Sequence, residues 1–376
     1  MKTVVIIGGG FAGLAAAARL RRAGDGVEVI LIDRRPTHQF LPLLPDLVGR
    51  DLDPSLLCYP LARAAAQTRC RLVQATVHAV DIAARRVLTD GDAIAFDYLL
   101  LASGVESDFY GQTQVRERAC EFRAAEDAAR LRARLPAGQA ATVVVAGGGY
   151  TGVEVATHVV RAGRRAGLRH RVVLVDPAPA ICNALPDPFR RYIAANLLAM
   201  GIETRLGTTV ADATHDSVTL AGGETFAPAA LVWTAGVRTA DFVHALPGSK
   251  TRQGRLEADP NLQFADACFA AGDVCAVVRG RQPLRMGVQA AISQGACAGD
   301  NIRRAIAGKP LRPYRPWDPG YLVPMANGRA CGRVLGVPVY GRVATWLHYA
   351  MCLVRLRGTG CRATVLRVLL AGTPRR

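Results

Sequence analysis

The chain lacks paired thiols, a long apolar run and metal-like histidine spacing. None of its ten cysteines lies in a CxxC pair or a zinc-like group of four, so no metal site is expected. No stretch of about 18 apolar residues is present, so no membrane-spanning helix is expected. Glycines interrupt the apolar start of the chain and argue against an export signal, which predicts free thiols in a reducing compartment.

Lysine is also scarce, yet the chain is strongly basic. Its 376 residues carry a formal net charge of +17, and half of them are hydrophobic. This composition provides a sizeable core, excludes global disorder and suggests two or three domains. Such charge suits nucleic acid, an anionic membrane or a small anion. Because no nucleic-acid-binding module is recognisable, nucleic acid is not an expected partner.

A glycine motif follows the first predicted strand. The apolar run 3–7 leads into GxGxxG spacing, a helical pattern follows from 14 to about 23, and a second apolar strand, 27–32, ends on Asp33. Such glycines allow a tight turn, backbone approach to a pyrophosphate and close helix packing, while the acid accepts hydrogen bonds from a ribose. The three glycines are Gly8, Gly10 and Gly13.

The same motif occurs again after the apolar run 141–146, with Gly147, Gly149 and Gly152 as its glycines. The strand 171–175 then ends on Asp176. A carboxylate here suits the free 2′-hydroxyl of NADH and would repel the 2′-phosphate of NADPH, so NADH is predicted. Two fingerprints about 140 residues apart predict two dinucleotides, FAD and NADH, in a flavoprotein that takes hydride from NADH.

We therefore expect an α/β fold with two Rossmann-like dinucleotide-binding domains, the second inserted in the first, and a C-terminal amphipathic segment. The FAD-binding domain is predicted at 1–110 and 256–320, and the NADH-binding domain at 111–255. Residues 321–376 are predicted to form a membrane-associating or dimerisation segment.

Further segments carry a resemblance to one superfamily. Two matching turns of small residues each follow a strand, one per dinucleotide domain, and a third strand ends in Gly-Asp. This layout resembles the two-dinucleotide-domain flavoproteins related to glutathione reductase. Within that group the chain looks most like the type II NADH dehydrogenases, the single-subunit NADH:quinone oxidoreductases. The segments that carry the resemblance are 38–44, 151–154, 233–237, 272–273 and 288–291.

The resemblance implies roles for particular residues. Glu154 would lie beside the nicotinamide and flavin, and Gln289 and Ser293 at the quinone-facing side, on a helix whose positive end stabilises the reduced flavin. The implied FAD-binding residues are Gly8, Gly10, Gly13, Asp33, His38, Pro42, Ser103, Gly104, Gly272, Asp273 and Val288. The implied NADH-binding residues are Gly147, Gly149, Tyr150, Gly152, Asp176, Ala235 and Gly236.

The quinone end departs from the family pattern. The family often carries AQxAxQ, but here Ser293 stands at the second glutamine, with Gln294 next along. A helix turns position 294 by about 100° from position 293, so a hydroxyl that can donate a hydrogen bond replaces an amide. Tyr150 also replaces a smaller residue of the family, and we expect its ring to cover the nicotinamide pocket.

Missing cysteines separate this chain from several relatives. Residues 37–57 hold no cysteine, unlike the segment after the first acid in disulfide reductases, and Thr151 stands where sulfide:quinone reductases use one. Three alternatives stay open. The first is a soluble NADH-dependent reductase of a protein partner, resembling ferredoxin reductases. The second is a sulfide:quinone-reductase-like enzyme with Cys120, Cys182 and Cys331 as distant cysteines, and the third is a weakly active redox sensor.

The tail carries a different signal. Residues 341–376 hold seven arginines, Arg375 and Arg376 among them, and no acid. Helices are predicted at 343–356 and 362–370, the first with a polar stripe at 345, 348, 352 and 355 and apolar residues around the rest. Basic amphipathic helices with Trp and Tyr lie in anionic bilayer interfaces. We expect a peripheral protein on the cytoplasmic face of the inner (plasma) membrane that reduces a quinone without pumping protons. The alternative is that these helices pack on the flavin domain or in a homodimer interface.

Overall fold

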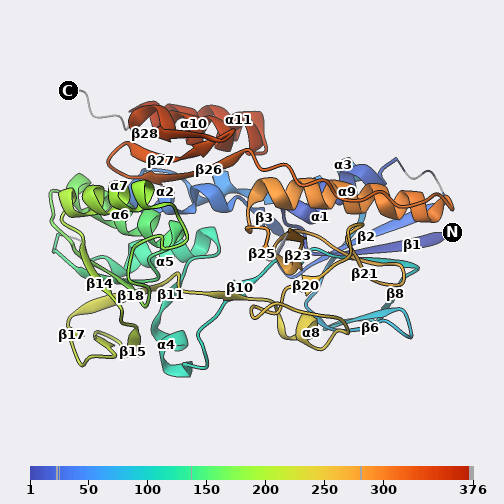
Figure 1. The fold of residues 1–376 in the computed structure, drawn as a ribbon, viewed down its shortest axis with the longest axis horizontal. Helices are drawn as coiled ribbons and strands as arrows, with labels where there is room; N and C mark the ends of the chain where they lie inside the picture. Colours follow the sequence, from blue (N-terminus) through green and yellow to red (C-terminus); the bar gives the residue numbers. More distant parts are fainter. Residues whose placement is uncertain (23, 25, 137, 280–281, 372–376) are drawn as a thin grey trace. The chain divides into compact units, whose positions relative to one another are not determined.

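A computed structural model describes residues 1–376 except 23, 25, 137, 280–281 and 372–376 (Figure 1). The described chain forms two compact units. The first contains residues 1–38, 59–106 and 237–318, and the second contains 39–58, 107–236 and 319–376. These units group residues by packing. The assignment of 1–110 and 256–320 to FAD and of 111–255 to NADH stays a prediction.

A six-stranded sheet forms the core of the first unit. Its centre is β1, in which residues 4–7 are buried apolar side chains. Continuous apolar runs of this kind form strands that are covered on both faces. The pairings within β9-β1-β2-β5 and between β22 and β9 are parallel, whereas β21 and β22 pair antiparallel. The strand order is β21 (Gln263–Ala265), β22 (Cys268–Ala270), β9 (Tyr98–Leu101), β1 (Lys2–Ile7), β2 (Val27–Asp33) and β5 (Arg71–Gln74).

Two helices of this unit, α1 (Phe11–Leu20) and α9 (Val288–Ile306), lie side by side (Figure 1). Glycines make this approach close, because a Cβ at Gly295 would clash with the carbonyl oxygen of Ala12, and one at Gly299 would lie 2.8 Å from that of Ala16. The α1–α9 interface is therefore tightly packed between small residues, with an ion pair of Arg19 and Asp300 at its exposed edge. The unit also contains α3 (Leu61–Thr68) and a three-stranded sheet of β6 (Val77–Asp81), β7 (Arg86–Thr89) and β8 (Ile94–Ala95).

The second unit repeats the design with a parallel five-stranded sheet centred on β12. Its order is β11 (Cys120–Glu121), β18 (Ala229–Trp233), β12 (Thr142–Ala146), β13 (Arg171–Asp176) and β14 (Glu203–Leu206). The helix after β12 is α6 (Tyr150–Arg165), which packs against β13, the short helix α2 (Leu44–Gly49) and β26 (Gly320–Met325). Two strand–glycine–helix units are thus present, and the predicted α/β fold is confirmed.

The C-terminal part of the second unit is a hairpin sheet covered by helices. Strands β26, β27 (Arg329–Val334) and β28 (Val337–Tyr340) pair antiparallel, and α10 (Gly341–Arg355) packs on them with α11 (Thr359–Ala371) beside it (Figure 1). Both predicted helices are therefore present. No described helix is long and apolar enough to cross a membrane. Arg375 and Arg376 lie outside the described residues.

The polar stripe of α10 faces the protein interior. Thr345, His348 and Cys352 are buried, whereas Val343 and Val354 are 66% and 74% exposed. The helix therefore buries its polar side and exposes much of its apolar side, which is the reverse of an ordinary surface helix.

Candidate active site

The first glycine loop joins β1 to α1 with a geometry that requires glycine. Gly8 has a φ of +109°, and a Cβ there would clash with the backbone of Ala102. A Cβ at Gly13 would clash with the carbonyl oxygen of Gly8, whereas one at Gly10 would meet no atom within 4 Å. The loop is therefore tight on its inner side and open beside the N-terminus of α1, where an anion is stabilised.

Asp33 holds this loop from the end of β2. Its Oδ2 accepts a hydrogen bond from the Gly9 N–H at 2.6 Å, and its Oδ1 accepts from the Arg35 N–H at 2.8 Å. His38 is buried, with Nδ1 3.1 Å from the Gly9 oxygen and its ring edge-on to Phe11. His38 therefore packs behind the loop. A carboxylate has about four acceptor positions, so Asp33 retains capacity for a ribose.

A cavity of about 120 Å³ opens at the carboxyl ends of β1 and β2. Four predicted FAD residues meet in its lining: Gly8, Asp33, Ser103 and Gly104. The Oγ of Ser103 is buried and has no hydrogen-bond partner. Because buried polar atoms in proteins are nearly always paired, this hydroxyl fits a polar ligand group in the cavity.

The second loop repeats the first. Gly147 has a φ of +106°, a Cβ at Gly152 would clash with the Gly147 oxygen, and one at Gly149 would meet nothing within 4 Å. Asp176 accepts from the Gly148 N–H at 2.6 Å and the Ala178 N–H at 2.8 Å. The loop can therefore receive a second pyrophosphate in the same way.

The turn after β18 closes on this second loop. The Oγ1 of Thr234 donates to the carbonyl oxygens of Ala146 at 2.8 Å and Gly147 at 3.1 Å. The predicted residues Ala235 and Gly236 follow, and Gly236 needs its φ of +73° for the turn. Thr234 was not among the predicted site residues, although its place before Ala-Gly is a local signal.

Glu154 and Tyr150 stand on the first turns of α6. Burial raises the pKa of the Glu154 carboxyl well above its usual range, and the charge of Asp46 adds to the shift. The carboxyl is therefore biased towards its neutral, proton-holding form. The Tyr150 ring lies 6.0 Å from that of Tyr321.

A buried polar network lies behind Glu154 and was not predicted. Arg50 donates from Nε to Asp46 Oδ1 at 2.5 Å and from Nη2 to the Tyr349 hydroxyl oxygen at 2.9 Å, and that hydroxyl lies 3.0 Å from Asp46 Oδ1. His158 Nε2 is 3.7 Å from the same Asp46 oxygen. Burial lowers the pKa of His158, and likewise that of His348, to about 4, so both rings are neutral near pH 7. The network links α2, α6 and α10.

The Gly272-Asp273 turn of the first unit is tied to α9 by a glutamine. The buried Oε1 of Gln294 accepts from the Gly272 N–H at 2.7 Å, and Arg255 Nε donates to the Asp273 carbonyl oxygen at 2.9 Å. Val288 and Gln289 begin the helix, as expected. Gln294 thus points into the core, and the expectation that it turns away from position 293 is confirmed.

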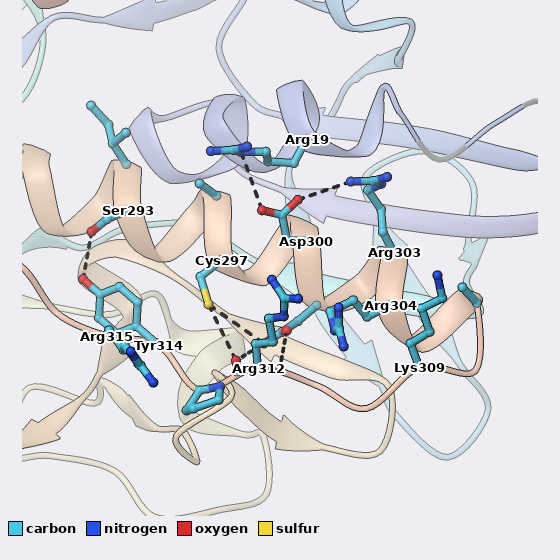
Figure 2. Close-up of a pocket in the computed structure, with 15 residues that line it drawn as sticks. Arg19, Ser293, Cys297, Asp300, Arg303, Arg304, Lys309, Arg312, Tyr314 and Arg315 are labelled. Atoms are coloured by element: carbon cyan, nitrogen blue, oxygen red, sulfur yellow. Dashed lines mark hydrogen bonds and ion pairs between the residues drawn. The ribbon is translucent and has the colours of Figure 1, made fainter.

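Ser293 forms a hydroxyl pair with Tyr314, as Figure 2 shows. The two oxygens are 2.8 Å apart, and Ser293 Oγ also donates towards the carbonyl oxygens of Gln289 and Ala290. Burial raises the pKa of Tyr314, so its hydroxyl keeps its proton. Tyr314 was missed by sequence reasoning because nothing local marks it.

Cys182 and Cys331, which the sulfide:quinone-reductase alternative would need, are buried. All ten cysteines are free. Burial raises the pKa of Cys182 and of Cys331 to about 12, which removes the thiolate that sulfur chemistry needs. No cluster of potential metal ligands occurs among the described residues.

The predicted site residues divide between the two units. Those in the first unit are Gly8, Gly10, Gly13, Asp33, His38, Ser103, Gly104, Gly272, Asp273, Val288, Gln289 and Ser293. Those in the second are Pro42, Gly147, Gly149, Tyr150, Gly152, Glu154, Asp176, Ala235 and Gly236. Each unit therefore carries one complete glycine loop with its carboxylate.

The duplicated loops identify the class of protein. Residues 2–295 match the family model of the pyridine nucleotide-disulphide oxidoreductases, and the chain belongs to that family. It is therefore an oxidoreductase, as predicted.

Individual relatives within the family indicate which of its members this chain resembles. The chain is 34% identical to an NADH dehydrogenase-like protein of Mycobacterium tuberculosis, covering 84% of each. It is 29% identical to the demethylphylloquinone reductase of Synechocystis, covering 94% of this chain and 91% of that protein. The fold matches NDH2 from Plasmodium falciparum in complex with NADH, at a TM-score of 0.84, 13% identity and 99% coverage of both chains. The predicted resemblance to type II NADH dehydrogenases is confirmed.

Proposed function

We propose that this chain is an FAD-dependent NADH:quinone oxidoreductase that pumps no protons. The observation that carries the proposal is the pair of complete glycine loops, each open beside a helix N-terminus and each braced by an aspartate. The type II NADH:quinone oxidoreductase of M. tuberculosis is 26% identical, with 96% of this chain and 86% of that protein covered.

FAD fits the residues of the first unit. When bound, it accepts hydride from NADH and supplies two electrons to the acceptor. The first loop and the N-terminus of α1 would hold its pyrophosphate, and Asp33 a ribose. The partnerless Ser103 hydroxyl would bond to it inside the cavity. By the resemblance, Asp273 would hold the ribityl chain, and the start of α9 at Val288 would stabilise negative charge.

NADH fits the second unit. The N-terminus of α6 would hold its pyrophosphate, and Asp176 its adenosine ribose. Tyr150 would cover the nicotinamide. Glu154 would hold a proton on its carboxyl near neutral pH, since burial raises its pKa. In this protonated form it adds no charge beside the nicotinamide and can donate a hydrogen bond.

The quinone end would be built by Gln289 and the Ser293–Tyr314 pair. Both hydroxyls are held in place by hydrogen bonds on α9. Ser293 Oγ donates its proton to backbone carbonyl oxygens, so the tyrosine proton forms the bond between the two hydroxyls. Rotation of the Tyr314 hydroxyl would turn that proton towards a quinone carbonyl. Tyr314 thereby supplies a polar group where the family often has a second glutamine.

The acceptor would arrive from a membrane. Helices α10 and α11 expose Val343, Trp346, Val354, Leu366 and Leu370 on a basic segment. Such helices rest in an anionic interface with their apolar side chains inserted. We infer a peripheral protein on the cytoplasmic face of the inner (plasma) membrane. A homodimer through the same helices is the competing use.

The first experiment follows the flavin absorbance without oxygen, in the presence of liposomes. NADH should bleach the flavin, and a ubiquinone or menaquinone analogue should restore it. A flavin that NADH fails to bleach would contradict both nucleotide assignments. For the catalytic residue, Glu154→Leu removes the hydrogen-bond donor and should lower kcat with NADH while flavin content stays unchanged, whereas Glu154→Gln keeps a neutral donor and should retain most of the activity. Glu126→Leu, an exposed change on another helix of the unit, is the control.

A second candidate function is favoured by a groove along α9 (Figure 2). The groove, of about 1050 Å³, is rich in cations, with Asp300 as the acid in its lining. The cations are Arg19, Arg303, Arg304, Lys309, Arg312 and Arg315. This charge suits an acidic redox protein. This candidate would be favoured if NADH bleaches the flavin, quinones fail to restore its absorbance and an iron–sulfur protein restores it.

A further inference from the structure

A second large cavity lies within the second unit, away from the glycine loop. It measures about 670 Å³ and is lined by parts of α6, α10 and the end of α11, together with Arg50. Its charged lining residues are all arginines: Arg50, Arg161, Arg164, Arg165 and Arg342. No acidic residue lines it in the described part of the chain.

Arg50 gives the cavity a buried donor without a partner. Its side chain is only 6% exposed. Asp46 and Tyr349 use its Nε and Nη2, but Nη1 is buried and has no hydrogen-bond partner. An unsatisfied buried donor destabilises the folded state, so a ligand oxygen that reached Nη1 would recover that loss. The buried donor therefore points to an anionic acceptor.

The rim of the cavity combines exposed cations with an aromatic ring. Arg164, Arg165 and Arg342 are exposed, and Trp346 is 43% exposed beside them. Guanidinium groups bind phosphate oxygens through paired N–H donors. Tryptophan favours the level of lipid headgroups. The arrangement thus joins a phosphate-binding interior to a rim suited to a bilayer interface.

We propose that this cavity binds the phosphate group of an anionic phospholipid headgroup. The inference rests on the proposed membrane association and deepens it, because it replaces diffuse attraction to a surface by a defined site for one lipid. The cavity volume lies within the range of about 300–1,000 Å³ common for small-molecule sites. The headgroup enters between the rim arginines, and a phosphate oxygen accepts from Arg50.

The two modes of binding differ in which arginines matter. Diffuse attraction depends on total charge near the surface, so any exposed arginine of this region contributes equally. A defined site depends on position, because only the lining arginines donate hydrogen bonds to the phosphate. Two variants with the same charge change therefore separate the modes.

The test compares Arg165→Gln/Arg342→Gln with the control Arg333→Gln/Arg367→Gln. All four arginines are exposed and lie in the second unit, but only the first two line the cavity. The purified flavin-loaded proteins are mixed with phosphatidylcholine vesicles with or without phosphatidylglycerol, and binding is measured by co-sedimentation. The cavity pair should lose about tenfold more affinity for the anionic vesicles than the control pair. Flavin content and circular dichroism check folding. Arg50 is left intact because its loss would leave the Asp46 carboxylate buried without its ion-pair partner.

A competition arm identifies the source of the phosphate. Short-chain phosphatidylglycerol should displace the wild-type protein from vesicles at concentrations where inorganic phosphate does not. Equal losses in the two variants would overturn the site in favour of diffuse attraction. Displacement by inorganic phosphate at equally low concentration would overturn the lipid headgroup in favour of a free phosphate ester. Wild-type protein that binds no vesicles would remove the membrane association as well, a result distinct from the other two.

Discussion

The two glycine loops share a backbone design but differ in what lies behind the helices that follow them. Gly8 and Gly147 have φ values of +109° and +106°, and each loop is braced by an aspartate with one N–H bond at 2.6 Å and one at 2.8 Å. Two residues after the third glycine, however, α1 has Ala15 where α6 has Glu154. The recurring part is set by the steric needs of a pyrophosphate.

The helix surroundings show the same contrast. Helix α1 meets α9 through Gly295 and Gly299 in an interface of small buried residues, and its one ion pair, Arg19–Asp300, lies at the exposed edge among the described residues. Helix α6 instead meets α2 and the C-terminal elements through buried polar groups, with His158 beside Asp46. The two loops are therefore alike, whereas the buried polar network lies behind the helix of the second unit.

The sharpest test of this comparison places a carboxylate in each loop. At Gly10 and Gly149 an added side chain begins in open space, so both variants should fold. Gly10→Glu should purify without flavin. Gly149→Glu should keep its flavin but raise the KM for NADH roughly a hundredfold, because its charge repels the pyrophosphate. Flavin absorbance and steady-state kinetics give both results, and full flavin in the Gly10→Glu variant would refute the first assignment.

Breaking the buried ion pair should have the next largest effect. Asp46→Asn leaves Arg50 buried without its carboxylate, which should lower the free energy of unfolding by about 3–5 kcal/mol. Denaturant titration measures this change. The control Asp53→Asn alters an exposed carboxylate of the same unit, and a loss as large as that of Asp46→Asn would contradict the importance of burial.

The histidines of the network predict how stability depends on pH. Their folded pKa of about 4 lies below the ordinary value of 6.5. Between these values the unfolded chain binds more protons, so the free energy of unfolding should fall by up to about 3 kcal/mol per histidine as the pH drops through this window. His158→Asn/His348→Asn should flatten the profile, whereas replacing the exposed His215 by Asn should not.

The mildest test removes one hydroxyl from each unit. Tyr349→Phe deletes the group that joins Arg50 to Asp46, which should cost about 1–3 kcal/mol. Tyr59→Phe deletes an exposed hydroxyl that bonds Gln67 in the first unit, and it should change stability by less than about 0.5 kcal/mol. Equal costs would contradict the importance of burial for the Tyr349 hydroxyl.

Local signals explain what the sequence could predict. Strand, glycine spacing and terminal acid lie within about 30 residues of one another, which is the span of one βαβ unit, and both loops were predicted from them. The orientation of α10 could not be predicted, because Tyr349 contacts Asp46, 303 positions away. Hydrophobic periodicity reveals which residues share a helix face. Whether the polar face turns inward depends on the residues that pack against the helix, and the local sequence does not contain them. Tyr314 was missed for the same reason, since Ser293 lies in a separate element.

Gln294 connects two elements of the first unit that are distant in the sequence. Its side chain joins α9 to the turn before Asp273 by one short buried bond across 22 positions of the chain. This hydrogen bond therefore fixes the second turn of α9 to the Gly272-Asp273 turn. Loss of the Gln294 amide would leave the Gly272 N–H buried without an acceptor, so the turn that carries Asp273 is positioned by a residue of another element.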